Sequence, residues 1–281
     1  MSEDGEGEGG RRLEREVRLK RIVAELEANP GMKLVSLADA FNVSTETIRR
    51  DLNKLTRQGL INRTYGGATI VPSGIDRPFP ERIAIHREER VAIARRAVKL
   101  VEAGEVLALA PGVTTLQFAR YLAAEASKIT VITNDLRITT TVGASERGRV
   151  IMLPGDYEKQ ESIVYGPEAE AFMSRFHVNK VFFGASGLTA EGPNEYDSRV
   201  TWIVRRMIEQ AQSVVLLVDH YKFGEMRLER ICPLTDIDID IIVTDQQPDA
   251  KLYEAMMTAG VELIVAGARN ADSAAASVEM S

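Results

Sequence analysis

The sequence has few of the residues that build metal sites, disulfide frameworks or membrane spans. Its 281 residues include one cysteine, Cys232, and three histidines. One thiol cannot form an internal disulfide and suits a reducing cytoplasm, and these four side chains allow no zinc-ligand spacing. No apolar run reaches the roughly 18 residues that a membrane-spanning helix needs. We therefore expect a cytoplasmic protein that contacts no membrane and holds no metal or other cofactor.

Sequence motifs of several enzyme classes are also absent. The segment GASGL lacks the second glycine of a G-x-S-x-G elbow, and neither a P-loop nor a dinucleotide fingerprint occurs. Asp219 and His220 are adjacent, and neighbouring residues of a strand point to opposite faces, which disfavours a relay between them. His86 and His177 have no nearby nucleophile and are expected at helix ends or on the surface. The residues alone do not exclude a phosphosugar isomerase, which needs a carboxylate base and cations that bind phosphate.

Positive charge is confined to one part of the chain. The whole chain has a formal net charge of −6, but residues 11–72 carry twelve Lys and Arg against seven Asp and Glu, a net charge of +5. Residues 73–281 have a net charge of −7. A small basic module ahead of a larger acidic one indicates a polyanion partner for the first module only.

Composition and periodicity divide the chain into five parts. The acidic, glycine-rich start predicts a disordered tail over 1–13, and 14–71 form the basic module. The proline-rich stretch after it predicts a linker over 72–85. Alternating apolar strands and helical stretches predict an α/β domain over 86–268, and 269–281 read as a loose tail.

The basic module has the pattern of a winged helix–turn–helix. Helical spacing begins near Glu14, a second short helix begins with Ser36 as its N-cap, and a third ends near Gln58. Asn42 can hold the left-handed conformation that the turn between the last two requires. The segment LINRTYGGATIV then predicts a hairpin around Gly66-Gly67, which would be the wing.

The third helix explains why an acidic protein carries adjacent arginines. Ile48, Leu52 and Leu55 share one face, and short hydroxyls and guanidinium groups occupy the opposite face. Such a helix fits the major groove of B-DNA, where Arg reads guanine and Thr contacts a base edge or a thymine methyl, while the wing lies along the backbone or minor groove. A solvated helix face is the alternative interpretation. The predicted DNA-binding residues are Ser44, Thr45, Thr47, Arg49, Arg50, Asn53, Lys54, Arg57, Arg63 and Tyr65.

The α/β domain is expected to contain a mostly parallel sheet. Its strand candidates are the segments VLALA, ITVIT, RVIML, KVFFGAS, SVVLLVD, DIIVTD and VELIVA. Near-continuous apolar strands joined by helical crossovers are typical of a parallel sheet with both faces covered.

Polar or small residues follow four of these strands, at the edge where ligands of parallel sheets bind. PGVTT joins a strand to a helix and could cradle an anion at the helix N-terminus. Lys222 would supply a cation and Asp219 a carboxylate. Together they suit a small, anionic, hydroxyl-rich metabolite such as a sugar phosphate. The predicted effector-binding residues are Gly112, Val113, Thr114, Thr115, Thr133, Asn134, Ser186, Asp219 and Lys222.

Each of these residues also has a purely structural interpretation. Glycine and threonine after a strand serve as turn and N-cap residues, and Ser186 can be a turn residue. Asn134 can cap a helix. Asp219 and Lys222 can form a surface ion pair of little energy.

The segment LADAFNVSTETIRRDLNKLTRQGLINRTYGGA closely resembles the N-terminal domain of DeoR-family bacterial transcription regulators. The resemblance covers residues 15–70 and includes the TIRRDL core and the YGGA wing. It implies binding to double-stranded operator DNA, with repression of a carbohydrate operon favoured over activation. Asn42 stands where the family usually has glycine.

Residues 86–245 resemble the effector domain of the same family, which is similar in fold to ribose-phosphate isomerase. The landmarks are TND, LPGDY, YGPEAEAF, FFGASG and DHYKFG. In the isomerases the loop matching GASG carries acidic catalytic residues, whereas this chain has Ser186 and Gly187, so the resemblance implies binding without turnover. The family's effector is typically a phosphorylated sugar whose binding releases the protein from its operator.

The first loop departs from the family pattern Asp-x-Gly-Thr-Thr-Thr. Ala110 replaces the carboxylate and Val113 the first threonine, so the effector has fewer hydroxyls at that end or other residues contact it. A homo-oligomer is expected, because paired half-sites multiply a modest single-module affinity.

Overall fold

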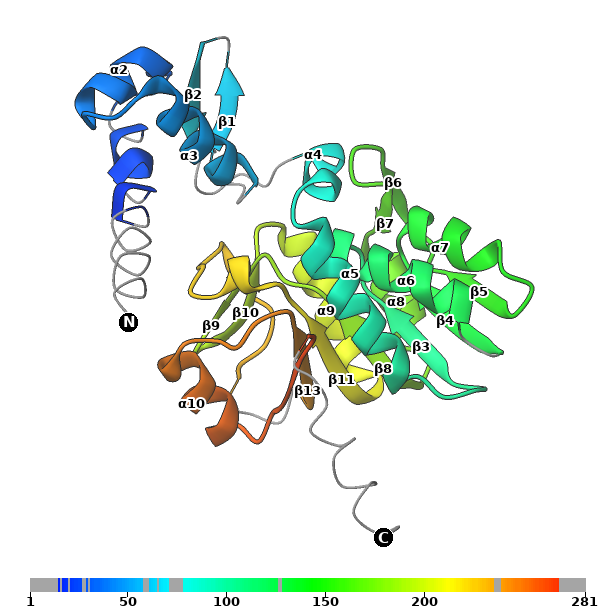
Figure 1. The fold of residues 1–281 in the computed structure, drawn as a ribbon. Coiled ribbons are helices and arrows are strands. Elements are labelled where there is room, and N and C mark those ends of the chain that lie inside the picture. Colours follow the sequence, from blue (N-terminus) through cyan, green and yellow to red (C-terminus); the bar gives the residue numbers. More distant parts are fainter. Residues whose placement is uncertain are drawn as a thin grey trace, which may run out of the picture. The chain divides into compact units, whose positions relative to one another are not determined.

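The computed structural model describes residues 15, 17–19, 21–26, 29, 31–57, 61–64, 66–70, 78–125, 128–234 and 239–267. The chain divides into two compact units, Met1–Arg77 and Pro78–Ser281 (Figure 1). The tails predicted over 1–13 and 269–281 lie outside the described residues. Each unit is described by itself.

The first unit is a winged helix–turn–helix. Helical residues among 15–26 precede α2 (Leu34–Ala40) and α3 (Thr45–Arg57), and Asn42 in the turn has φ of 48°. The prediction of a left-handed turn residue is therefore confirmed. The apolar faces of the helices share one small core with the first strand of the wing: Leu19, Ile22, Leu26, Leu37, Ile48, Leu52, Leu55 and Ile61.

Helix α2 begins earlier than the sequence predicts. Ser36 was expected at the N-cap, but α2 starts at Leu34, with Lys33 as the residue before it. The wing accounts for the difference: the Leu34 N–H donates to the Gly66 carbonyl at 2.9 Å, and Lys33 bridges to Gly67. A tertiary contact therefore sets this helix start.

The wing is a hairpin of β1 (Ile61–Thr64) and β2 (Gly67–Ile70). Its base packs tightly on the segment before α2. A Cβ atom at Gly67 would lie 2.3 Å from the Met32 carbonyl oxygen and 3.2 Å from the Lys33 Cα. Because both neighbours are backbone atoms, only glycine fits there.

Gly67→Ala is expected to destabilise the first unit by about 2–3 kcal/mol, because the backbone must move to relieve the overlap. Urea unfolding of the full chain measures the change. Gly66→Ala is the matched control: its φ is 85° but nothing lies within 4 Å of an added Cβ, so only the left-handed strain of about 1 kcal/mol applies. Equal losses in the two variants would contradict the packing argument.

A buried carboxylate ties α3 to the first helical segment. Asp51 is 1% exposed and accepts hydrogen bonds from the Arg15 Nε at 3.1 Å and the Arg18 Nε at 2.7 Å. From the sequence, Asp51 is one of the acidic residues of the basic module and has no predicted role. Its position between two guanidinium groups makes it part of the packing of this unit.

The second unit is built on a seven-stranded parallel sheet in the order β14-β13-β11-β8-β3-β4-β5. Each of the seven predicted strand segments contributes one strand: β3 (Val106–Leu109), β4 (Ile129–Thr133), β5 (Gly148–Met152), β8 (Val178–Phe183), β11 (Ala211–Leu217), β13 (Ile241–Thr244) and β14 (Glu262–Val265). The prediction of a winged helix–turn–helix followed by a parallel α/β domain is confirmed.

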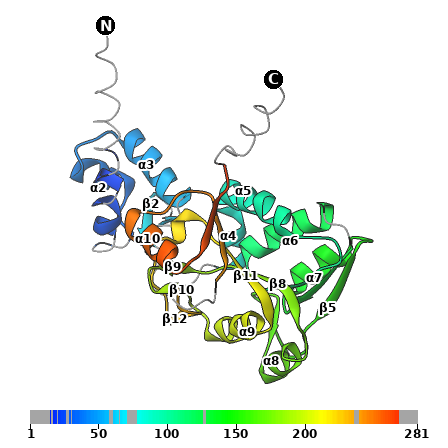
Figure 2. The same cartoon turned by 90° about the horizontal axis from the view of Figure 1, so that it is seen from below.

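Helices cover both faces of the sheet (Figure 2). One face packs against α5 (Arg87–Ala97), α6 (Val113–Glu125) and α7 (Leu136–Gly143). The other packs against α8 (Pro167–Met173), α9 (Ser198–Glu209) and α10 (Ala250–Thr258). Burial on both sides explains why the strands are apolar runs rather than alternating sequences.

The predicted linker over 72–85 is shorter than expected. Residues 79–84 form α4 (Phe79–Ala84), and Phe79 is 5% exposed against the core of the second unit. Pro80 occupies the first turn of α4, where its missing N–H has no cost. The proline-rich composition therefore predicted a linker where the structure has a short helix. Residues 72–77 lie outside the described part of the chain.

Two small sheets flank the large one. β6 (Asp156–Glu158) pairs with β7 (Ile163–Tyr165), and β10 (Gly192–Glu195) pairs with β9 (Gly187–Thr189) and β12 (Glu229–Arg230). No helix in the described ranges combines the length and apolar character needed to cross a bilayer. The same residues contain no cluster of three or more His, Cys, Asp or Glu suited to a metal ion.

Candidate DNA-binding and effector sites

The face of α3 opposite the core is exposed. Ile48 and Leu52 are fully buried, whereas the side chain of Arg50 is 73% exposed and that of Arg49 58%. Ser44 caps the helix: its Oγ accepts the Thr47 N–H at 3.1 Å. Ser44, Thr45 and Asn53 are exposed, and Thr47 and Lys54 are half-buried. The structure thus brings these predicted DNA-binding residues to one side of the helix and its cap.

The two adjacent arginines pair with a carboxylate on their own helix. Arg49 Nη1 lies 3.2 Å from Glu46 Oε2, and Arg50 Nε lies 3.4 Å from Glu46 Oε1. All three side chains are more than half exposed, and exposed pairs of this kind contribute little free energy. A polyanion can therefore displace Glu46 at low cost.

The wing carries the remaining predicted contacts. Arg63 is exposed on β1. Tyr65 and the side chain of Arg57 lie outside the described residues.

The second unit gathers the four predicted effector loops at one edge of the sheet. They follow β4, β3, β8 and β11, which are neighbours in the sheet and run parallel. The chain leaves β3 toward β4 and β5, and later returns to β8 on the other side of β3. The carboxyl ends of β3 and β8 therefore flank the topological switch point, where ligands bind in sheets of this kind.

The PGVTT loop turns from β3 into α6. Gly112 has φ of 146°, and its carbonyl accepts the Leu116 N–H at 2.9 Å and the Thr115 hydroxyl at 3.0 Å. Thr114 and Thr115 are buried, and Val113 is half-buried. The hydroxyl of Thr115 thus holds the turn, so only the backbone N–H groups of the first turn of α6 are left as candidate donors to an anion in this loop.

The loop after β4 is held by buried polar contacts. Thr133 Oγ1 accepts the Asp135 N–H at 3.1 Å, and Asn134 Nδ2 donates to the Val164 carbonyl at 2.8 Å. Asn134 does not cap a helix, contrary to its structural interpretation; Asp135 caps α7 instead. Burial raises the pKa of Asp135, opposed by the N–H groups of Ile138, Arg137 and Gly112. Asn134 Oδ1 is a buried acceptor that has no partner among the described residues.

The GASG loop after β8 contacts a carboxylate that sequence reasoning missed. Ser186 is 7% exposed and donates to Glu195 Oε1 at 2.5 Å, and the same oxygen accepts the Tyr196 N–H at 2.8 Å. Glu195 comes from β10, nine positions later in the chain. It is engaged with Ser186 and the backbone.

The loop after β11 carries a buried charge cluster. Asp219 is 2% exposed and caps the short helix η2 (His220–Lys222) by accepting the Tyr221 N–H at 3.2 Å. Burial raises the pKa of Asp219, although the positive charges of Lys222 and Arg90 oppose this. Among the described residues the side chain of Lys222 has no hydrogen-bond partner, and its positive charge acts on Asp219. The predicted surface ion pair is therefore a buried carboxylate beside two cations.

His220 pairs with Asp245, which follows the neighbouring strand β13, and not with Asp219, which precedes it in the sequence. Its Nδ1 lies 2.5 Å from Asp245 Oδ2, and its N–H donates to Asp245 Oδ1 at 2.8 Å. Burial lowers the pKa of His220, but the hydrogen bond and the charge of Asp245 outweigh it and raise the pKa overall. The expectation that Asp219 and His220 form no relay agrees with this pairing. His86 precedes α5 and His177 is exposed, as predicted.

The His220–Asp245 pair should make stability depend on pH. The raised pKa of His220 stabilises the folded protein fully at pH values below 6.5, the ordinary pKa. This stabilisation is lost as the pH rises through the pKa that His220 has in the folded protein. Burial raises the pKa of Asp245, but the hydrogen bonds from His220 and its charge together outweigh burial and lower this pKa overall. The stabilisation that Asp245 provides is therefore lost only as the pH falls below 3.8. We expect His220→Gln to destabilise the second unit at pH 5.5 by about 1.5–3 kcal/mol, and by less at pH 8.5. Urea unfolding measures both; the exposed His177→Gln is the control and should show no such difference.

Arg90 lies beside the candidate site, and the sequence contains a signal for its burial. The buried face of α5 consists of Arg90, Ile93, Ala94 and Ala97. A charged residue on an otherwise apolar helix face requires a buried partner, and here Asp219 supplies the opposite charge. Asp245 and Glu195 gave no such signal, because neither lies on a helix face that is otherwise apolar.

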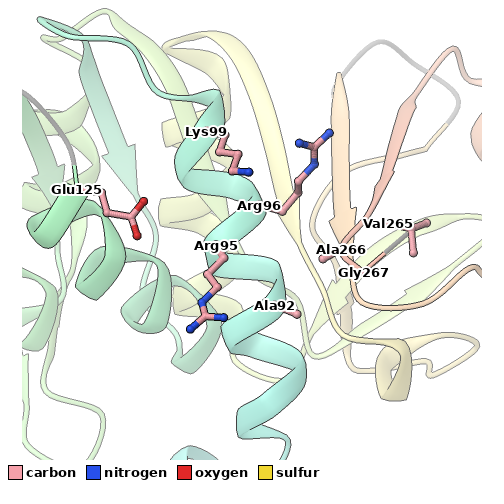
Figure 3. A pocket seen from close by; sticks show the side chains of 8 residues that line it. All are labelled: Ala92, Arg95, Arg96, Lys99, Glu125, Val265, Ala266 and Gly267. Carbon is pink, nitrogen blue, oxygen red and sulfur yellow. The ribbon is translucent and has the colours of Figure 1, made fainter. Parts of the chain in front are cut away.

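A separate pocket of about 530 Å³ lies between α5 and the end of β14 (Figure 3). Its polar lining consists of Arg95, Arg96, Lys99 and Glu125. None of the predicted effector residues lines it. Its charged groups are long side chains that are exposed or half-exposed, in contrast to the buried polar groups at the sheet edge.

Two family models match the chain. Residues 18–73 match a DeoR-like helix-turn-helix domain, and residues 85–246 match a DeoR C-terminal sensor domain. One match lies within each compact unit.

Curated relatives match over most of their length. The transcriptional regulator IolR of Bacillus subtilis is 31% identical, over 83% of this chain and 92% of its own. The glycerol-3-phosphate regulon repressor of Escherichia coli is 30% identical over 81% and 89%, and the regulator GlpR of Haloferax volcanii is 33% identical over 90% and 98%.

Two solved structures show low similarity to this chain. A ribose 5-phosphate isomerase from Methanocaldococcus jannaschii matches with a TM-score of 0.36 and 19% identity, over 50% of this chain and 55% of its own. The tetrameric eIF2B β2δ2 complex from C. thermophilum matches with a TM-score of 0.46 and 16% identity, over 86% and 72%.

Proposed function

Because the chain belongs to the DeoR family of DNA-binding transcriptional regulators, we propose that it represses a carbohydrate or polyol catabolic operon and that a small anionic effector releases it. The observation that carries the proposal is the exposed face of α3. Arg49 and Arg50 project from it and are paired only weakly with Glu46. The predicted DNA-binding residues of α3, its cap and the wing form the surface that contacts the operator, which we call the reading surface.

The second unit supports an anionic effector with hydroxyl groups. The N-terminus of α6 offers backbone N–H groups, and Lys222 offers an ammonium group beside the same sheet edge. Asn134 Oδ1, which has no partner among the described residues, suits a ligand hydroxyl. One relative is named for the glycerol-3-phosphate regulon, so a sugar or polyol phosphate is the effector class we propose.

We also propose that the second unit binds its effector without turning it over. The loop after β8 presents Ser186 rather than an acid, and Glu195 beside it is engaged with Ser186 and the Tyr196 N–H. The regulator acts in the cytoplasm as a homo-oligomer whose two reading helices contact paired half-sites. The effector shifts the equilibrium between arrangements with different operator affinity, limited by its own differential affinity for them.

Two experiments test the proposal. Duplexes selected from a random pool by the full-length protein should converge on a paired half-site sequence. A thermal-shift screen of sugar and polyol phosphates, with each unphosphorylated parent as control, should then identify a ligand that weakens binding to the selected duplex. Failure to select any sequence would contradict the DNA-binding role. Turnover of aldose or ketose phosphates would favour an enzyme.

Lys222→Ala is expected to weaken effector binding about 10–100-fold, because a hydrogen bond to a charged group is lost. Affinity for the selected duplex should stay unchanged, since Lys222 lies in the second unit and hydrogen-bonds no other described side chain. Titration of the best phosphate from the screen against the protein–DNA complex measures both. A wild-type response in this variant would remove Lys222 from the site.

A further inference from the structure

Two segments far apart in sequence meet at the carboxyl edge of the sheet. One is 79–90, where the chain enters the second unit through α4 and α5 (Figure 1). The other is 219–222, the effector loop after β11. The rings of His86 and Tyr221 stack with their centroids 3.8 Å apart, and the Tyr221 hydroxyl donates to Glu89 at 3.5 Å.

A buried arginine strengthens the same junction. Arg90 is 4% exposed, and its Nη2 donates to the carbonyls of Ile83 and Ile85, which close the turn between α4 and α5. Its charge is attracted by Asp219. Arg90 therefore connects the entry segment to the carboxylate that caps η2.

The backbone at the junction is strained. His86 has φ of 53°, in the left-handed region that non-glycine residues rarely adopt. Such conformations persist only where surrounding contacts hold them. The stack on Tyr221 and the anchoring of Ile85 by Arg90 supply those contacts.

The far side of the effector loop is fixed to the sheet. His220 binds Asp245 at the end of β13 through both its backbone N–H and its ring. Because this side of the loop is held by the sheet, we expect a movement of residues 219–222 to be toward the entry segment.

We propose that His86, Glu89, Arg90, Asp219 and Tyr221 form a clamp that couples the effector site to the segment leading from the DNA-binding unit. The closed clamp stabilises the operator-binding arrangement. An anionic effector at Lys222 draws that cation away from Asp219, changes the charge balance around Asp219 and Arg90, and loosens residues 79–90. The coupling rests on the proposed function because it takes loop 219–222 as part of the effector site.

The test uses the full-length protein without effector. Tyr221→Leu removes the ring stack and the bond to Glu89, and His86→Gly removes the stack while relieving the left-handed strain. In both, amide hydrogen exchange over 79–90 should quicken about tenfold or more, while exchange in α9 stays unchanged. Affinity for a duplex selected by the wild-type protein should fall about fivefold or more, measured by fluorescence anisotropy.

Two further variants serve as controls. Tyr221→Phe keeps the stacked ring and should restore most of the wild-type exchange and affinity. Tyr253→Leu makes the same change at a tyrosine on α10, which is 39% exposed, and should alter neither quantity.

Two results would overturn the clamp. One is unchanged exchange over 79–90 in both Tyr221→Leu and His86→Gly. The other is faster exchange with operator affinity within twofold of wild type, which would make the junction merely structural. If the wild-type protein selects no duplex, the proposed function fails instead, and the exchange measurement still reports on the junction.

Discussion

In an Arg50→Ala variant, specific operator binding is expected to fall about tenfold or more for each half-site, and about a hundredfold for a protein that contacts two. An arginine that reads guanine bidentately contributes about 1–3 kcal/mol of discrimination. Arg50 stands in mid-helix with its side chain 73% exposed, and among the described residues its only carboxylate partner is the exposed Glu46. The fold should be unaffected, since no buried group depends on this side chain.

Fluorescence anisotropy with the selected duplex and with a scrambled duplex separates the two contributions to binding. Loss confined to the selected duplex indicates base reading, whereas an equal loss on both indicates a phosphate contact. Arg149→Ala removes the same charge from an exposed position on β5 of the second unit and should change neither affinity. Undiminished binding by Arg50→Ala would remove this residue from the reading surface.

The neighbouring residue should give the opposite phenotype. Asp51→Ala is expected to destabilise the first unit by about 2–4 kcal/mol, because removing one partner of a buried ion pair is costly. The lower end applies if the freed guanidinium groups become hydrated, since Arg15 is 44% exposed and Arg18 22%. A domain of this size has a total stability of only about 3–9 kcal/mol, so much of it would be lost.

Unfolding of the full chain, followed by amide exchange in α3, measures the effect. Asp39→Ala is the matched control, because Asp39 is exposed on α2 and should unfold like wild type. DNA binding by Asp51→Ala should return at low temperature, where the remaining stability suffices. A fully stable Asp51→Ala unit would show that the two ion pairs contribute nothing to the packing of α3.

The sequence predicted the sheet well because its signal is local. Seven apolar runs bounded by polar loops became the seven parallel strands, and burial on both faces explains each run without reference to any partner. The turn at Asn42 was equally predictable, since few residues accept a left-handed φ. Helix α4 was missed because its prolines suggested a linker, although proline is well suited to the first turn of a helix.

The polar contacts of the site could not be predicted in the same way. Asp51 with Arg15, His220 with Asp245 and Ser186 with Glu195 each join segments that only the fold brings together. The loops were placed correctly at the carboxyl edge, since parallel strands require it. Which hydroxyls face a ligand and which close a turn depends on rotamers and neighbours, as the inward bond of Thr115 to Gly112 shows.

The close packing of Gly67 on Met32 holds the wing against the segment that leads into α2, and so limits how the wing can move relative to α3. The hairpin base packs on the segment before α2, and α2 shares a core with α3, so the wing with Arg63 and the helix with Arg50 belong to one packed unit. If both residues contact DNA as proposed, an operator whose grooves are spaced differently must bend to fit, and flexible base steps at that position should be recognised without being touched.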